Sequence, residues 1–83
     1  MQVTITENEE KNAIELLFSE NLPNEFSTFL LELGFREVLK KKNTWYADAH
    51  PAYKIFAASL RDAFSRGDDW KTVSMYPSFQ PSL

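Results

Sequence analysis

Three consecutive lysines followed by two aromatic side chains form the first group in the sequence that could bind a ligand. Lys40, Lys41 and Lys42 precede Trp45 and Tyr46. Lysines neutralise phosphates and an aromatic ring stacks on a nucleobase, so the group is compatible with nucleic-acid binding. Lysines at a turn also keep a hairpin soluble and discourage pairing with other chains. Both interpretations stay open, and solvation is the preferred one.

A second group, of apolar side chains, lies near the C-terminal end of the sequence. It consists of Trp70, Val73, Met75, Tyr76 and Phe79. A disordered tail is normally poorer in aromatic residues. We therefore expect residues 68–83 to form an aromatic, proline-containing arm, buried on its own domain or against a second chain in a homodimer.

Groups that could carry catalysis are sparse. The single histidine, His50, has no nucleophile at a motif spacing and lies where a helix cap belongs. The chain has no cysteine, which excludes disulfides and thiolate chemistry. The acidic pairs 9–10 and 68–69 lack the ligand spacing of a calcium loop and are predicted to be solvated turns. We predict no enzymatic activity, no cofactor and no metal site.

Hydrophobic periodicity predicts the elements that position these groups. Residues 2–6 and 13–18 alternate as strands and are expected to form a hairpin. A helix is predicted to begin with Asn21 as its cap and Pro23 in its first turn. Its buried stripe consists of Phe26, Phe29, Leu30 and Leu33, and Gly34 ends it.

The second half of the chain predicts two more strands and a second helix. Residues 35–40 and 44–49 are expected to pair across a basic turn at 41–43. The second helix is expected to begin with Pro51 at or near its first position and to be closed by residues 65–67. Residues 70–76 are expected to form a strand or an extended arm.

These elements predict an α+β fold with the order β-α-β-β-α, both helices on one face of the sheet, and further strands allowed at 2–6 and 70–76. The helix-covered face is expected to carry Ile14, Leu16, Phe18, Phe35, Leu39 and one of Trp45 and Tyr46. The opposite face is expected to be open. With 83 residues, 43% of them hydrophobic and 25% charged, the chain is expected to form a single small domain, 1–83.

Charge is divided unevenly along the chain, whose net charge is −3 and whose pI is about 5.0. Residues 1–37 hold eight acids and two bases, whereas residues 38–66 hold six bases and two acids. One basic face on an acidic protein is therefore allowed. Residues 1–7 do not have the pattern of a secretory signal, and no segment has the length of a membrane span, so we expect a cytoplasmic location without membrane contact.

The segment LGFREVLKKKNTWYA, residues 33–47, carries a resemblance to a known group of domains. With its flanking helices it resembles the small modules associated with polyvalent proteins of plasmids, phages and conjugative elements. The resemblance spans residues 13–66. Arg36 stands where these modules have a basic residue, whereas Val38 replaces their polar aromatic. The resemblance implies a nucleic-acid or host-interaction context of a mobile element, without naming an activity.

The leading hypothesis is a non-enzymatic protein-interaction module that binds a protein partner or a second copy of itself. Its site would be the aromatic sheet face or the C-terminal arm. The alternative is a nucleic-acid-binding accessory module that uses the lysine turn and its neighbouring aromatics.

Overall fold

The computed structural model describes residues 1–74 of the chain. Its elements are β1 (Val3–Asn8), β2 (Ala13–Phe18), α1 (Asn24–Leu33), β3 (Arg36–Glu37), β4 (Thr44–Asp48), α2 (Pro51–Ser65) and α3 (Trp70–Ser74). The four strands form one antiparallel sheet in the order β1-β2-β4-β3. The predicted α+β class is confirmed, including the N-terminal strand.

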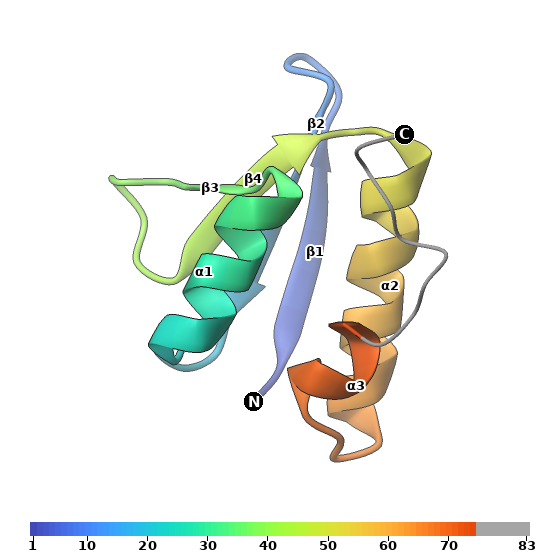
Figure 1. Ribbon diagram of the computed structural model, residues 1–83. Coiled ribbons are helices and arrows are strands. Elements are labelled where there is room, and N and C mark those ends of the chain that lie inside the picture. Colours follow the sequence, from blue (N-terminus) through green and yellow to red (C-terminus); the bar gives the residue numbers. More distant parts are fainter. Residues whose placement is uncertain (75–83) are drawn as a thin grey trace.

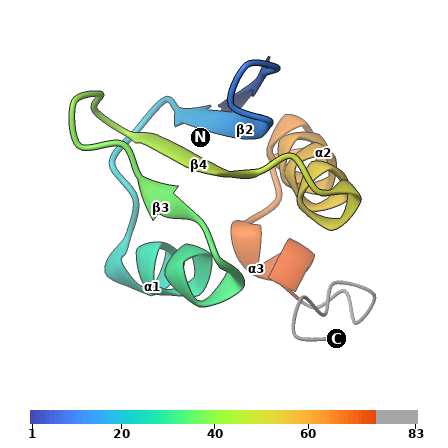
Figure 2. The same cartoon turned by 90° about the horizontal axis from the view of Figure 1, so that it is seen from above.

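The helices lie on one side of this sheet, and α3 lies between α1 and α2 (Figure 1, Figure 2). Strand register explains which side they cover. Leu16 pairs with Trp45 and Ile14 pairs with Ala47, so the apolar residues of β2 and β4 share a face. All four side chains are buried, with exposed fractions between 0% and 4%.

The two longer helices bury apolar residues against that face. In α1 the buried residues are Phe26 and Leu30, and in α2 they are Phe56, Ala57, Leu60 and Ala63. The ring of Phe26 meets the ring of Phe18 from β2 edge-on at 5.4 Å between centroids. Edge-on packing of this kind is a favourable aromatic geometry. The core is therefore one aromatic-rich layer between sheet and helices.

The start of α1 differs from the prediction, whereas its end agrees. Pro23, with φ −59° and ψ 151°, occupies the N-cap, and no side chain caps the helix. Asn21 is therefore not the cap: with the extended Pro23 as N-cap, the helix begins two residues later than expected. At the other end Gly34 adopts φ 116°, and the N–H of the buried Phe35 donates to the carbonyl of Leu30 at 2.9 Å.

The start of α2 agrees with the prediction in full. Pro51 is the first helical residue and His50 is the N-cap. The imidazole Nδ1 of His50 accepts a hydrogen bond from the backbone N–H of Ala52 at 3.0 Å. This bond satisfies one of the amides that a helix start leaves unpaired. His50 thus has the structural role expected for it.

The strand predicted over residues 35–40 is shorter than expected. Only Arg36–Glu37 forms β3, because the chain turns after Val38. The N–H of Lys41 donates to the carbonyl of Val38 at 3.1 Å, and this turn ends the alternation of faces. Leu39 is 92% exposed as a result, so its assignment to the helix-covered face is wrong.

Residues 70–74 form a short helix rather than the predicted strand. The chain reverses at Gly67, with φ 82°, and the N–H of Asp68 donates to the carbonyl of Ala63 at 2.8 Å. This reversal carries α3 back to α1, where Trp70 stacks on Phe26 at 4.9 Å between centroids. The packing of α3 against α1, which the turn at Gly67 makes possible, therefore stabilises a helix in this segment.

The residues predicted for the C-terminal arm divide into two sets. Val73 is 4% exposed, and Trp70 is partly buried against the same core. Both side chains therefore pack against the core of their own domain. Met75, Tyr76 and Phe79 lie outside the described residues.

Candidate interaction surface

The side of the sheet that no helix of residues 1–74 covers carries the candidate site, which we call the open face. Its members alternate along the strands with the core residues: Thr4, Thr6, Ala13, Glu15, Leu17, Thr44, Tyr46 and Asp48. Leu17 is 50% exposed and Tyr46 is 41% exposed, although both lie on central strands. Single apolar residues on a surface are common, but neighbouring ones on the same exposed sheet face mark a candidate contact surface.

Cross-strand register brings these two side chains together around one carboxylate. Glu15 pairs with Tyr46 across β2 and β4, and with Thr6 across β2 and β1. Leu17 lies two residues farther along the same strand and therefore on the same face. Glu15 and Tyr46 are directly opposed, and Leu17, which is opposite Thr44, is the diagonal neighbour of Tyr46. Diagonal neighbours lie within reach of an aromatic side chain, so the three residues share one region of the open face.

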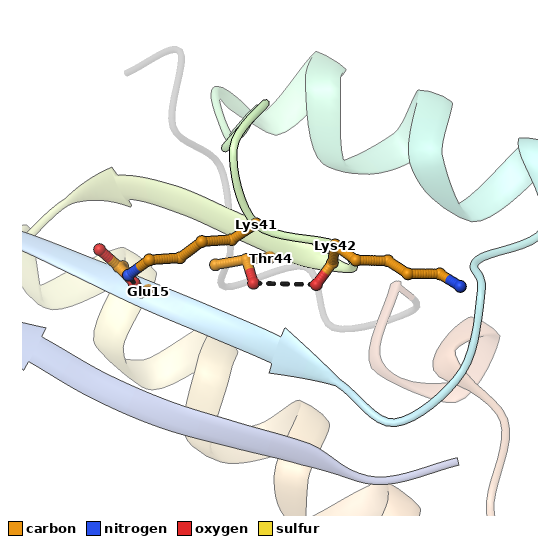
Figure 3. Close-up of polar contacts among 4 residues, drawn as sticks. All are labelled: Glu15, Lys41, Lys42 and Thr44. Atoms are coloured by element: carbon orange, nitrogen blue, oxygen red, sulfur yellow. Dashed lines mark hydrogen bonds and ion pairs between the residues drawn. The ribbon is translucent and has the colours of Figure 1, made fainter.

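Two lysine side chains of the basic turn, Lys41 and Lys42, point in opposite directions (Figure 3). Lys41 Nζ lies 3.5 Å from Glu15 Oε1, and Figure 3 shows its chain extending over the sheet toward that carboxylate. Lys42 points the opposite way, while its carbonyl accepts a hydrogen bond from Thr44 Oγ1 at 3.1 Å. Lys41 and Lys42 therefore do not form one positive cluster, although they are adjacent in sequence. Lys41 belongs to the open face instead.

The two aromatics beside the lysine turn also lie on different faces. Trp45 is 4% exposed and packs in the core, whereas Tyr46 is exposed on the open face. A buried indole offers no surface for a nucleobase to stack on. Trp45 therefore cannot serve as the predicted nucleic-acid contact, and Tyr46 is the one aromatic of the pair that a ligand can reach.

A shallow depression adjoins the open face at the β1–β2 hairpin. Its lining consists of Thr6, Glu7, Asn8, Glu9, Glu10, Glu15 and Lys41. Four carboxylates line the depression, and even with Lys41 in the lining and Lys54 Nζ 3.1 Å from Glu7, acidic groups outnumber basic ones, which favours basic ligands. Within residues 1–74, no three histidine, aspartate or glutamate side chains gather closely enough to hold a metal ion.

The sequence did not single out Glu15 and Leu17 as site residues, although the signal was present. Ile14, Leu16 and Phe18 were assigned to the covered face, so strict alternation places Glu15 and Leu17 on the other. The contact between Lys41 and Glu15 joins residues 26 positions apart in the chain. No local pattern in the sequence predicts that contact.

Comparison of the chain with family models, with curated proteins and with solved structures finds no match. The resemblance to modules of mobile elements therefore stays a prediction. Among the helices described in residues 1–74, none has the length and apolar character needed to cross a membrane.

Proposed function

We propose that the protein is a non-enzymatic interaction module that binds a protein partner on the open face of its sheet. The observation that supports this most directly is the exposure of Leu17 and Tyr46 beside Glu15, on a face that no described helix covers. Tyrosine at the centre of such a patch is typical of binding hot spots, because it combines a large ring with a polar hydroxyl.

The charges around the patch define the chemistry of the partner. The acidic depression lies next to Leu17 and Tyr46 through the shared residue Glu15. A partner segment with an apolar side chain flanked by lysine or arginine complements both features. On binding, its basic group would compete with Lys41, which holds Glu15 at 3.5 Å in the free protein.

Nucleic-acid binding is the alternative function, and Lys40 and Lys42 support it because both are exposed at the turn. Three features weigh against it. Trp45 is buried, Lys41 is paired with a carboxylate, and the surface beside the turn is acidic. A polyanion would meet repulsion from these glutamates, so we favour the protein partner.

The test is a selection of peptides from a random displayed library against the protein, followed by binding measurements on synthetic peptides. We expect enrichment of sequences that join an aromatic or aliphatic residue to lysine or arginine. Tyr46→Ala should weaken their binding by at least about tenfold, as hot-spot truncations do. Leu31→Ser is the matched control, because Leu31 is 46% exposed on α1, away from the sheet face.

Equal loss in both variants, or no loss in either, would contradict the assignment to the open face. The nucleic-acid alternative is measured in parallel with single- and double-stranded oligonucleotides at two salt concentrations. Phosphate-dependent binding weakens steeply with salt. If oligonucleotides bind and simultaneous replacement of Lys40, Lys41 and Lys42 by glutamine abolishes that binding, the alternative replaces the proposal.

A further inference from the structure

Within the described residues, the strand β1 forms one edge of the sheet and pairs with β2 alone. The N–H of Ser19 donates to the carbonyl of Gln2 at 3.0 Å, which fixes the phase of the β1–β2 ladder. Hydrogen-bonded and non-hydrogen-bonded pairs alternate in an antiparallel ladder. Even-numbered residues of β1 therefore bond to β2, and Val3, Ile5 and Glu7 direct their N–H and C=O groups outward.

These outward groups lack partners within the described chain. Among residues 1–74, no backbone hydrogen bond outside the β1–β2 ladder involves Val3, Ile5 or Glu7. β1 lies at the margin of the sheet, with α2 as the helix that packs beside it (Figure 1, Figure 2). Unpaired edge groups of this kind are a template for another strand.

The two edges of the sheet differ in how well they are protected against pairing. The β3 edge is two residues long, and Phe35 next to it bonds to α1. The β1 edge is six residues long, continuous in register, and free of proline, lysine and bulges. Short length, proline, lysine and bulges are four of the devices that blunt an edge, and β1 has none of them. An inward-pointing charge is a further device, and Glu7 is such a charge, but Lys54 of α2 pairs with it. The backbone of β1 is thus less protected against pairing than that of β3.

We propose that β1 pairs antiparallel with β1 of a second copy, so that two four-stranded sheets become one sheet of eight strands. A two-fold axis at Ile5 sets Ile5 opposite the partner's Ile5 and Val3 opposite the partner's Glu7. In this register every outward-facing residue of β1 meets an outward-facing residue of the other strand. Each such pair exchanges two backbone hydrogen bonds.

The side chains of β1 suit this register. Thr4 lies opposite the partner's Thr6 on the open face, and cross-strand threonine pairs are favourable. Glu7 is the one charged residue of the strand, and it faces valine rather than a second glutamate. Lys54 Nζ from α2 already lies 3.1 Å from Glu7 Oε1, which lowers the local charge at the edge. An identical strand therefore meets no like charge, which is why we assign the edge to a second copy.

This inference goes beyond the proposed function, because it concerns the edge of the sheet and a measurement that needs no other partner. The test is sedimentation equilibrium of the full chain over a dilution series. We expect a reversible monomer–dimer equilibrium of the 9.6 kDa chain. A monomer at every concentration would overturn the proposal and would leave the binding of peptides to the open face unaffected.

Two double variants test the register itself. Thr4→Lys with Thr6→Lys sets lysine opposite lysine at both symmetric positions, whereas Thr4→Glu with Thr6→Lys sets glutamate opposite lysine. Both threonines are exposed, so the monomer is preserved. We expect the dissociation constant of the first variant to exceed that of the second by about tenfold or more. Net charge alone predicts the reverse, because the first variant is closer to neutral. Equal dissociation constants would overturn the register.

A third comparison isolates the backbone. Glu7→Pro removes an outward N–H, and proline is tolerated where the N–H of an edge strand faces away from its neighbour. Glu7→Ala removes the same carboxylate and its contact with Lys54 but keeps that N–H. We expect the proline variant to be monomeric and the alanine variant to dimerise, with both keeping the circular dichroism of the wild type. Dimerisation of a folded proline variant would overturn the proposal.

Discussion

Truncating Trp70 is the sharpest test of how the C-terminal segment is used. The indole of Trp70 stacks on Phe26 at 4.9 Å with an interplanar angle of 4°, and on Phe29 at 5.4 Å. Both phenylalanines belong to α1, which is far away in sequence. Trp70→Ala therefore removes the link by which α3 closes the core over α1, while it leaves the sheet untouched.

The magnitude follows from burial and stacking. Replacement of a fully buried tryptophan by alanine costs about 3–5 kcal/mol. Trp70 is only partly buried, so we expect a loss of about 2–3 kcal/mol, to which the two stacked pairs contribute about 1 kcal/mol each. In a domain of this size, such a loss lowers the melting temperature by about 10–20 °C.

The assay is urea unfolding followed by circular dichroism and by tryptophan fluorescence. Trp45 stays in the Trp70→Ala variant as the single tryptophan, buried at 4% exposure, and reports on the core. Thr72→Ala is the matched control, because Thr72 is an exposed residue of the same short helix. It should change stability by less than about 0.5 kcal/mol.

Two results would refute the reasoning. If Trp70→Ala behaved like Thr72→Ala, α3 would not be part of the core. If the destabilisation appeared only at high protein concentration, the indole would stabilise an assembly rather than its own domain, since the stability of an associating protein depends on concentration. The second result would restore the interpretation of this segment as an arm between subunits.

Three further substitutions test a core residue and two helix ends. In each case the change in stability is measured by the shift of the urea unfolding midpoint. Leu30→Ala should cost about 2–5 kcal/mol, because Leu30 is fully buried in α1, and a cost below about 0.5 kcal/mol would mean that the buried face is misassigned. Gly34→Ala should cost about 2 kcal/mol or more, because φ is 116° and the new methyl group would collide with the hydroxyl of Tyr53; a neutral effect would contradict the left-handed geometry. His50→Ala should cost about 1 kcal/mol by removing the acceptor for the amide of Ala52, and unchanged stability would show that water caps α2 equally well.

The parts of the fold that were predictable from sequence are those with a local cause. The stripe of α1, the glycine that ends it and the cap of α2 at His50 all depend on residues within a few positions of one another. Strand β2 was predictable for the same reason, because alternation over six residues needs no distant partner.

The errors arose where a distant contact decides the outcome. The turn after Val38 depends on pairing with β4, so alternation alone carried the predicted strand too far and misplaced Leu39. The five residues of α3 are too few to show helical periodicity in the sequence. The helix is stabilised by the stacking of Trp70 on two phenylalanine rings of α1. Alternation placed Trp45 and Tyr46 on opposite faces, but only the pairing of Trp45 with Leu16 determines which one is buried.

The packing of α3 changes where interaction is to be sought. Trp70 and Val73 complete the core, so within residues 1–74 they leave no aromatic arm for a partner. Among the exposed apolar residues of the described chain, Leu17 and Tyr46 share the open face of the sheet, and the outer edge of β1 has backbone groups without a partner in residues 1–74.

The two proposed surfaces are adjacent, because Thr4 and Thr6 of β1 lie on the same face as Glu15 and Leu17. Pairing of two β1 strands would therefore place two open faces side by side on one continuous sheet. A partner that carries two copies of a basic-apolar segment could then occupy both at once. Its second contact would form at a high effective concentration, so weak binding by a single 83-residue module would become strong binding by the pair.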